Sequence, residues 1–419
     1  MSETRFWNGY ANMGALRDAA VTLVRGERST VFDDTGRAYL DAIGGLWYCN
    51  VGYGRREIAD AVAAQMRELA VFQTFEFYKN LPTETLARRV AALAPIANAR
   101  VFFTPGGGSD AIDTAAKLAR AFWRVTGQPD KHVILSREFA YHGMNGYGTS
   151  LGGIAANLAV AGPIVTDVER VAWDSPAALR EAIERQGPAM VAAFFCEPVI
   201  GAGGVLHPPA GYLAEVQAIC REHDVLFVVD EVITGFGRLG EWFGAARFGL
   251  SPDLVTCAKG LTSGYLPLGA VIAGERVCEP FWRRGTAEVF RHGYTYGGHP
   301  AAAAAALANL DVIENERLLE RVRRLEPVLA AALRPLASHP LVAEVRAGLG
   351  LLGAVQLRPE ALQQRPDLLP RIVLEARKRG VLTRGLRGVA LQVSPPFVIT
   401  EGEIAIVARV FGEALDANL

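Results

Sequence analysis

The fold of this chain is decided by the stretch Val225-Leu226-Phe227-Val228-Val229-Asp230-Glu231, a short apolar run that ends in two acids. A second apolar run, Asp253-Leu254-Val255-Thr256-Cys257-Ala258, follows a glycine-rich turn and leads directly to Lys259. Both runs are short and bounded by turn residues, which predicts two fully buried strands of a parallel sheet. The chemistry of an open α/β sheet lies beyond the carboxyl ends of its strands, so we expect Asp230 and Lys259 to lie close together there.

A carboxylate and a primary amine placed side by side suit chemistry with an aldehyde cofactor. The amine can form a Schiff base with pyridoxal phosphate (PLP), while the carboxylate keeps the pyridine nitrogen protonated so that the ring accepts electrons. Lys259 is one of only five lysines among 43 basic side chains, and lysine alone offers an amine that can lose its proton. The alternative is a purely structural ion pair between Lys259 and Asp230, since such pairs also occur in clefts.

Length and composition narrow the class of protein. The chain has 419 residues, half of them hydrophobic, and a formal net charge of -1. This length predicts at least two domains, and a near-neutral charge gives no electrostatic reason to expect nucleic acid as a partner. We expect no membrane association, because the sequence shows neither a signal-peptide pattern nor an apolar run long enough to span a bilayer. Five scattered cysteines without a CxxC spacing predict no metal site and no disulfide framework, and favour the cytoplasm.

Two more strands are predicted to bring polar groups to the same edge of the sheet. Residues 100–103 form one, followed by Thr104-Pro105-Gly106-Gly107-Gly108-Ser109-Asp110 and a long helix. Bare N–H groups at a helix start, with Ser109 as the cap, make a cup for a phosphate, although glycines in such turns also serve plain geometry. The other strand, residues 191–196, ends in Glu197. Ionisable residues repeated at strand ends are hard to explain by packing alone.

The residues alone leave the roles of two aromatic side chains undecided. Tyr141 follows a strand predicted at residues 132–135, and Trp47 lies in the glycine-rich stretch from Ile43 to Asn50. An aromatic face on a loop can form the wall of a ligand pocket or stack on a planar ring. Equally, Trp47 can cap the core, and an aromatic such as Tyr141 is commonly part of a core.

The stretch Gly348-Leu349-Gly350-Leu351-Leu352-Gly353 matches the GxGxxG pattern of dinucleotide sites. That pattern needs a preceding strand and a following helix. Here Ala354 to Leu357 alternate like a strand and stop at Pro359, so we reject a nicotinamide site. From about residue 315 an amphipathic helix, short strands and another helix predict a second, smaller domain.

These motifs together resemble the class III PLP-dependent aminotransferases, of PLP fold type I, over nearly the whole chain. The most specific part is the stretch from Phe227 to Arg238 with Lys259 downstream. The resemblance implies an α/β fold: a large domain with a mostly parallel, seven-stranded sheet, and a smaller α+β domain built from both chain ends. We expect residues 1–55 and 315–419 in the small domain and residues 56–314 in the large one.

The resemblance also implies a role for each matched position. Lys259 would hold PLP as a Schiff base, Asp230 would bind the ring nitrogen, and Val232 and Tyr141 would pack on the two faces of the ring. Further implied cofactor contacts are Gly108, Ser109, His142, Glu197 and Thr295. Thr295 would reach the phosphate of the partner subunit, which implies a homodimer with shared sites, or a tetramer. One hydroxyl of the family's usual phosphate cup is missing, because Gly107 stands in place of its first serine.

Within the family, the motifs are most similar to ω-transaminases that pass an amine to pyruvate. The stretches that carry this likeness are Gly45–Trp47, Glu197–Val205 and Pro395–Phe397. The implied substrate contacts are Tyr10, Trp47, Phe75, Met144 and Arg384. Arg384 would bind the keto acid carboxylate through a planar fork, with Arg387 as the alternative. A related PLP decarboxylase or aminomutase and a non-catalytic PLP-fold binding protein are the competing functions.

Overall fold

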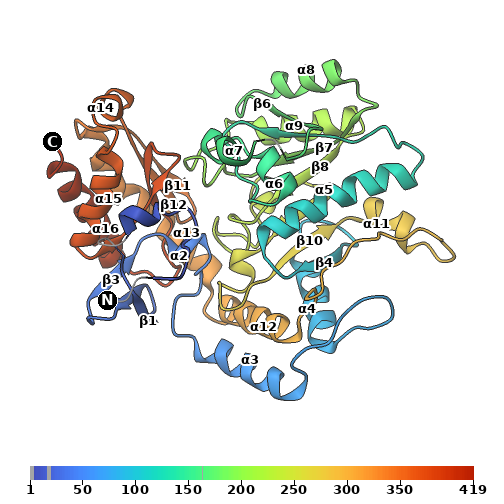
Figure 1. The fold of residues 1–419 in the computed structure, drawn as a ribbon, viewed down its shortest axis with the longest axis horizontal. Helices are drawn as coiled ribbons and strands as arrows, with labels where there is room; N and C mark the ends of the chain where they lie inside the picture. The colour runs from blue at the N-terminus through green and yellow to red at the C-terminus, as the bar shows by residue number, and fades with distance from the viewer. Residues whose placement is uncertain (1–3, 17–19, 163) are drawn as a thin grey trace.

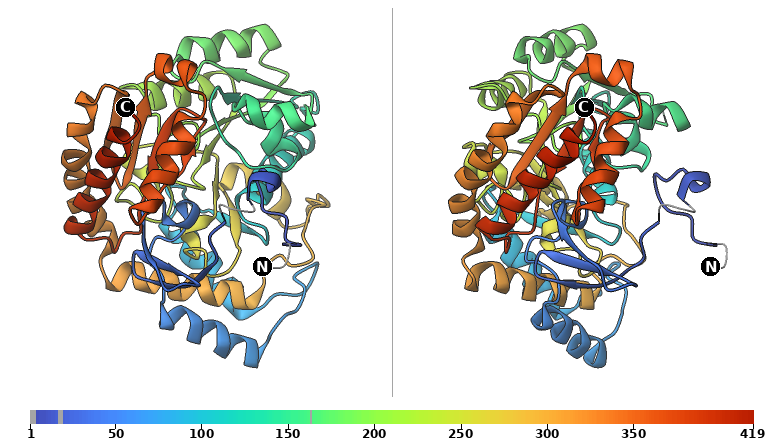
Figure 2. Two further views of the ribbon diagram at one scale, coloured as in Figure 1. Left: turned by 60° about the vertical axis from the view of Figure 1, so that its left-hand side comes forward. Right: turned by 90° about the vertical axis from the view of Figure 1, so that its left-hand side faces the viewer.

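The computed structural model describes residues 4–16, 20–162 and 164–419. Figure 1 shows two parts side by side, one built around a large sheet and one that holds both ends of the chain. The N-terminal segment with α1 (Met13–Leu16) extends along the outside of the molecule (Figure 2). Phe6, Trp7 and Tyr10 in this segment are all more than 70% exposed.

The large part contains a seven-stranded sheet with the order β4-β10-β9-β8-β7-β5-β6. Strand β10 runs antiparallel to its neighbours β4 and β9, and all other neighbours are parallel, so the prediction of a mostly parallel sheet is confirmed. The strands are β4 (Arg100–Thr104), β5 (Val133–Arg137), β6 (Val168–Val171), β7 (Val191–Cys196), β8 (Leu226–Asp230), β9 (Leu254–Cys257) and β10 (Gly269–Ala273).

Both faces of this sheet are buried, which explains why its strands read as continuous apolar runs. Successive side chains alternate between two cores. Phe194, Phe227 and Val229 belong to one, and Phe195, Leu226 and Val228 belong to the other. The helices of this part are α3 (Arg56–Glu68), α4 (Leu81–Leu93), α5 (Gly108–Val125), α6 (Gly146–Leu151), α7 (Ala155–Ala161), α8 (Pro176–Gln186), α9 (Tyr212–Glu222), α10 (Gly244–Arg247), α11 (Glu275–Trp282) and α12 (Pro300–Asn315).

Helix α5 packs against the sheet through a stripe of small side chains. Ala111, Ala115 and Ala119 recur at helical spacing and are fully buried, so the helix backbone lies close to strands β7, β9 and β10. The helix α12 packs on α3 and α4 at the other side of the part. The start of α5 is thereby fixed next to the carboxyl ends of β8 and β9.

The second part combines segments from both chain ends. Strand β13 (Val381–Leu382) pairs in parallel with β3 (Ala38–Asp41), which continues into β2 (Thr30–Asp33) and β1 (Leu23–Glu27). A second sheet has the order β11-β12-β15-β14. Its strands are β11 (Val342–Leu349), β12 (Leu352–Leu357), β14 (Gly385–Leu386) and β15 (Ala390–Val393), covered by α13 (Leu318–Leu333), α14 (Pro359–Gln364), α15 (Leu368–Lys378) and α16 (Glu401–Asp416).

The Gly348–Gly353 stretch forms the turn of an antiparallel hairpin between β11 and β12. Gly350 has φ +60°, and a Cβ there would lie 2.0 Å from the carbonyl oxygen of Arg238. Glycine is therefore needed at this position for a turn and a close approach, with no helix following. The strand predicted after these glycines is therefore confirmed, in place of the helix that a dinucleotide site needs.

Candidate active site

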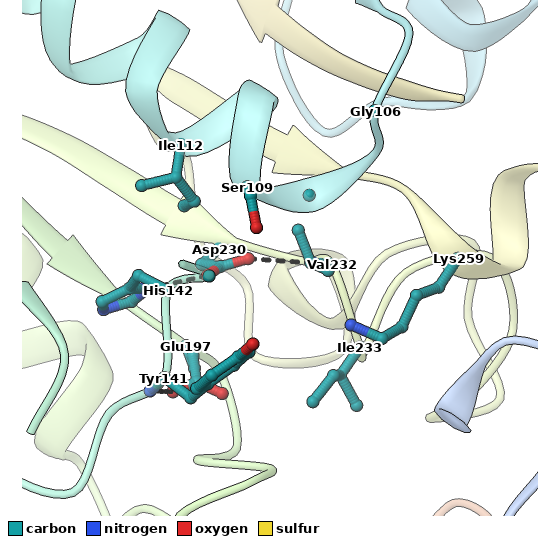
Figure 3. A pocket seen from close by; sticks show the side chains of 12 residues that line it. Gly106, Ser109, Ile112, Tyr141, His142, Glu197, Asp230, Val232, Ile233 and Lys259 are labelled. Carbon is teal, nitrogen blue, oxygen red and sulfur yellow. Dashed lines mark hydrogen bonds and ion pairs between the residues drawn. The ribbon is translucent and has the colours of Figure 1, made fainter. Parts of the chain in front are cut away.

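A pocket lies at the carboxyl ends of β7, β8 and β9 and at the start of α5, where an open α/β sheet carries its chemistry (Figure 3). Strand β8 pairs in parallel with β9, with Asp230 opposite Thr256. Eight of the nine predicted cofactor residues line this one pocket: Gly108, Ser109, Tyr141, His142, Glu197, Asp230, Val232 and Lys259. Thr295 is the exception.

Asp230 is buried and is held by three hydrogen bonds. Its Oδ2 atom lies 2.7 Å from His142 Nδ1, and its Oδ1 atom accepts from Val232 N at 3.0 Å and from Thr256 Oγ1 at 3.2 Å. Within the described residues, His142 Nε2 is buried and has no partner. The carboxylate is thus fixed in orientation as a hydrogen-bond acceptor on the pocket wall.

Lys259 begins the short 3-10 helix η1 (Lys259–Leu261) with a φ of +40°, a left-handed conformation that is costly for a lysine and typical of functional sites. Its side chain points into the pocket (Figure 3). Among the described residues it takes part in no hydrogen bond or ion pair. Removal from water lowers the pKa of the amine to about 8, although the negative charges of Asp230 and Glu197 act to raise it.

The phosphate cup predicted from the sequence is built differently from the expectation. The predicted cap, Ser109, lies inside the helix; Gly107 is the N-cap residue of α5, with φ +92°. That prediction is wrong because the cap position needs a positive φ, which glycine adopts at little cost. Ser109 Oγ instead accepts a hydrogen bond from Met144 N at 3.1 Å, so its hydroxyl holds the loop after Tyr141 against the start of α5.

Gly108 shows why the cup needs a residue without a side chain. A Cβ at this position would lie 2.7 Å from Val232 Cγ1. The first turn of α5 therefore presents bare N–H groups to the pocket, and the positive end of the helix favours an anion there. Gly107 itself carries no hydroxyl, so the backbone N–H groups and Ser109 are what this turn offers to an anion.

Glu197 connects the end of β7 to the loop that carries Tyr141. Its carboxylate accepts hydrogen bonds from Tyr141 N at 3.1 Å and from Gly201 N at 2.9 Å. Burial raises the pKa of this carboxyl, partly offset by His142. Tyr141 thus projects its ring into the pocket from a backbone that Glu197 fixes (Figure 3).

Two predicted substrate residues meet at the rim of the pocket. Tyr10 OH donates a hydrogen bond to Met144 Sδ at 2.9 Å, which brings the N-terminal segment next to the loop after Tyr141. Tyr10 and Arg384 both lie within electrostatic reach of the Tyr141 hydroxyl. Tyr10, Met144 and Arg384 thus lie near Tyr141 or the loop that follows it.

The two candidate arginines lie in different surroundings. The charge of Arg384 helps to lower the pKa of Lys259, which places its guanidinium near the pocket. Burial lowers the pKa of Arg384 itself. Arg387 has φ +47°, and its guanidinium stacks on the ring of Phe139, 3.8 Å from the centroid. The charge of Arg384 thus acts on both Lys259 and Tyr141, whereas the guanidinium of Arg387 is engaged with Phe139.

Like Tyr10, Met144 and Arg384, three more predicted residues are not among those that line the pocket. Trp47 is 2% exposed and packs in a cluster with Ile233, which is itself on the pocket wall. Phe75 lies against Gly293, where a Cβ would approach its ring to 2.9 Å. Thr295 follows in the same loop and is exposed. Phe75 thus lines a second cleft with Gly293 and Tyr294, and neither Phe75 nor Thr295 is among the residues that line the pocket of Lys259.

The structure adds residues that sequence reasoning missed. Thr256 bonds to Asp230 from the neighbouring strand, and its signal was a polar side chain inside the apolar run that leads to Lys259. Ile233 lines the pocket next to Val232, as do Gly106, Ile112 and Gly143. Apolar residues of this kind carry no chemical signal in a single sequence.

These residues fit PLP on structural grounds. The pocket combines an unpartnered amine, a fixed buried carboxylate, a helix start without a side chain at Gly108, and an aromatic ring at Tyr141. These groups match the aldehyde, the pyridine nitrogen, the phosphate and the planar ring of the cofactor.

Known proteins similar to this chain are transaminases. The family model for class-III aminotransferases matches residues 13–415. The putrescine–pyruvate aminotransferase of Pseudomonas aeruginosa is 37% identical over 417 residues, 94% of this chain and 90% of its own length. The omega-amino acid–pyruvate aminotransferase of Pseudomonas putida is 39% identical over 375 residues, 84% of this chain and 83% of its own length. A crystal structure of an amine transaminase from an uncultivated Pseudomonas species, in its PLP-bound form, matches with a TM-score of 0.93 and 35% identity over 100% of both chains.

Proposed function

The chain belongs to the class-III aminotransferases, and on that premise we propose that it passes an amino group from an amine or ω-amino acid to pyruvate. It is a PLP-dependent transaminase. The observation that carries the proposal is the convergence of Asp230 and Lys259 in one pocket, beside a helix start suited to a phosphate. The named relatives act as transaminases with pyruvate, which favours this function over a decarboxylase or an aminomutase.

PLP supplies an aldehyde that condenses with amines and a ring that accepts the electrons of a broken C–H bond. Lys259 would hold the cofactor. Once displaced by the substrate amine, it would carry a proton from the amine-bearing carbon of the donor to the former aldehyde carbon of the cofactor. A lysine with a pKa of about 8 is suited to this role, because it exchanges a proton readily near neutral pH. Asp230 would hold the ring nitrogen, fixed by its bonds to His142 and Thr256.

The other predicted residues would place the cofactor and its substrates. Gly108 and Ser109 would bind the phosphate, with Val232 and Tyr141 on the two faces of the ring. Tyr10 and Met144 would bound the space for an apolar amine, and Trp47 would support its wall through Ile233. A carboxylate in such a space would lose its hydration without a partner. Arg384 would supply one, since its planar fork donates hydrogen bonds to both carboxylate oxygens.

The proposed enzyme is a homodimer in which Thr295 and Phe75 complete the site of the partner. The support is a group of exposed aromatic side chains on the surface around these two residues: Phe72, Phe77, Tyr78 and Tyr296 are each at least half exposed. A large exposed aromatic surface marks an interaction site. A verified monomer with full PLP occupancy would contradict the shared site.

Two further expectations belong to this proposal. The division into a small domain of residues 1–55 and 315–419 and a large domain of residues 56–314 is supported by the pairing of β3 with β13. We place the enzyme in the cytoplasm, where its five free and buried cysteines remain reduced. Across the described residues, no helix combines the length and the apolar character needed to cross a membrane.

Separate half-reactions test the proposed function. The PLP-loaded protein should lose its visible absorbance when an arylalkyl amine or an ω-amino acid is added, and pyruvate should restore it. Alanine should accumulate in proportion to the carbonyl product of the donor. Release of carbon dioxide, or turnover without any keto acid, would instead establish a decarboxylase or an aminomutase.

A further inference from the structure

The loop of residues 290–298, here called the 290s loop, carries the exposed Thr295 between two anchored sides. On its upstream side, Thr114 Oγ1 lies 2.9 Å from His292 Nε2 and 3.2 Å from Tyr294 OH. Tyr294 OH also donates to the carbonyl oxygen of Asp110 at 3.2 Å. The anchor residue Thr114 is fully buried in α5.

The downstream side of the 290s loop is anchored to a different segment. Thr74 Oγ1 donates to the carbonyl oxygen of Gly297, and Asn80 Nδ2 and Thr83 Oγ1 donate to that of Gly298, each at 2.9 Å. Thr295 therefore stands between two sets of hydrogen bonds. A polar residue held in this way is fixed in position before any partner reaches it.

The upstream anchor is made on the helix that forms the phosphate cup. Gly108 and Ser109 open α5 and line the pocket, and Thr114 follows on the same helix. The His292 ring also stacks on Phe102, with ring centroids 5.6 Å apart and an interplanar angle of 22°. Phe102 belongs to β4, the strand that leads into the cup. Helix α5 thus supports the cup at its start and the 290s loop through Thr114.

We propose that Thr114 is a positioning residue through which each subunit holds Thr295 in place for the cofactor phosphate of its partner. This inference rests on the proposed shared site. The helix that binds one phosphate would then also fix the loop that completes the other site, so the two cofactor sites of a dimer would be coupled. Loss of the Thr114 hydroxyl would loosen the loop of its own subunit and weaken PLP in the opposite site.

Hybrid dimers test the direction of this effect. In the first hybrid, one subunit carries Thr114→Val and Lys259→Ala, and the other is wild type. Only the wild-type subunit can then show the absorbance of lysine-linked PLP, and its site receives Thr295 from the altered subunit. We expect PLP release from that site to be roughly threefold to tenfold faster, the effect of losing one or two hydrogen bonds.

In the second hybrid, Thr114→Val is placed in the subunit that retains Lys259, and its partner carries Lys259→Ala alone. Release should then match that of a hybrid without the Thr114 change. Faster release in this second hybrid, or no change in the first, would overturn the inference. A structural defect of α5 would act on its own subunit, so it would speed release in the second hybrid and leave the first unchanged.

Further variants control for damage to the fold. Tyr294→Phe removes one of the two contacts of Thr114 and should act across the dimer in the same direction. Thr114→Ser keeps the hydroxyl and should restore slow release. Thr149→Val is the matched control, because this buried threonine has no hydrogen-bond partner for Oγ1 within the described residues. Equal effects of Thr149→Val and Thr114→Val would also overturn the inference.

Thr295→Ala in the same two hybrids separates this inference from the proposed function. If Thr295→Ala accelerates release only in its own subunit, the shared site itself is wrong. If it acts across the dimer while Thr114→Val does not, the shared site stands and the positioning role of Thr114 fails.

Discussion

Thr256 Oγ1 lies 3.2 Å from Asp230 Oδ1, across two parallel strands in which these residues face each other in register. The hydroxyl therefore comes from the same strand that delivers Lys259 three positions later. One strand pair thus sets both the position of the carboxylate and that of the amine. Substitutions in this pair separate the contributions of the two groups to turnover.

Replacing Asp230 by Asn should leave the fold intact and lower the turnover number by about 10²-fold or more, because a fixed charge next to the ring nitrogen is lost. Thr256→Val should lower the turnover number less, by roughly threefold to tenfold, as expected for the loss of one hydrogen bond. Asp253→Asn is the control: this carboxylate bonds to Phe227 N at the opposite end of the same strands. An unaltered turnover number for Asp230→Asn would show that Asp230 does not serve the ring nitrogen.

Lys259→Ala should abolish turnover and the absorbance of lysine-linked PLP while the circular dichroism spectrum is retained. The reason is that Lys259 is the only lysine among the residues that line the pocket. Lys378→Ala, which removes an exposed lysine on α15, should have no effect on either signal. Residual transamination by purified Lys259→Ala would remove this lysine from the mechanism.

The cofactor-free protein should be stabilised by Lys259→Met, and the gain should depend on pH. The pKa of Lys259 is about 8 in the folded chain, against a reference value of 10.5, so the folded chain binds this proton less readily than the unfolded chain does. The resulting loss in the free energy of unfolding is fully present below pH 8 and disappears as the pH rises from 8 to 10.5. It amounts to at most about 3 kcal/mol, reduced by the access of water to the pocket.

Thermal unfolding of the cofactor-free wild type and Lys259→Met at pH 7 and pH 10 measures this difference. The gain in melting temperature should be larger at pH 7. A gain that is the same at both pH values would show that packing, and not the charge of the amine, limits the stability of the pocket.

Arg384→Ala should weaken the reaction with pyruvate more than the reaction with an arylalkyl amine, by roughly 1.5–3 kcal/mol, the contribution of a hydrogen bond to a charged group. Pre-steady-state measurement of the two half-reactions gives both effects separately. Arg387→Ala is the matched control, because its guanidinium is engaged with Phe139. Equal losses for amine and pyruvate, or a selective loss only for Arg387→Ala, would contradict the assignment.

The sequence was most informative where a chemical group follows a buried strand. The positions of Glu197, Asp230 and Lys259 at one sheet edge followed from short apolar runs, since parallel strands end on the same side. The cap of α5 could not be read in the same way. Three successive glycines precede Ser109, and the choice of Gly107 depends on a backbone angle that a single sequence does not display.

Residues that act through a second element were the least predictable. The contact of Thr256 with Asp230 depends on the register of two strands, and the link from Thr114 to His292 joins residues 178 positions apart. The substrate role of Trp47 and the roles of Phe75 and Thr295 were taken from a resemblance, which assigns roles but not surroundings. The single chain buries Trp47 among apolar side chains and leaves Thr295 exposed.

The pairing of β3 with β13 has a consequence for synthesis of the chain on the ribosome. Val381 must be translated before Leu40 gains its partner, which takes on the order of half a minute at about 5–20 residues per second. During this interval the edge of β3 is open in the nascent polypeptide, and open edges invite pairing with other chains. A stalled or prematurely terminated product would thus release an unfinished N-terminal sheet, which makes it a substrate for chaperones and proteases.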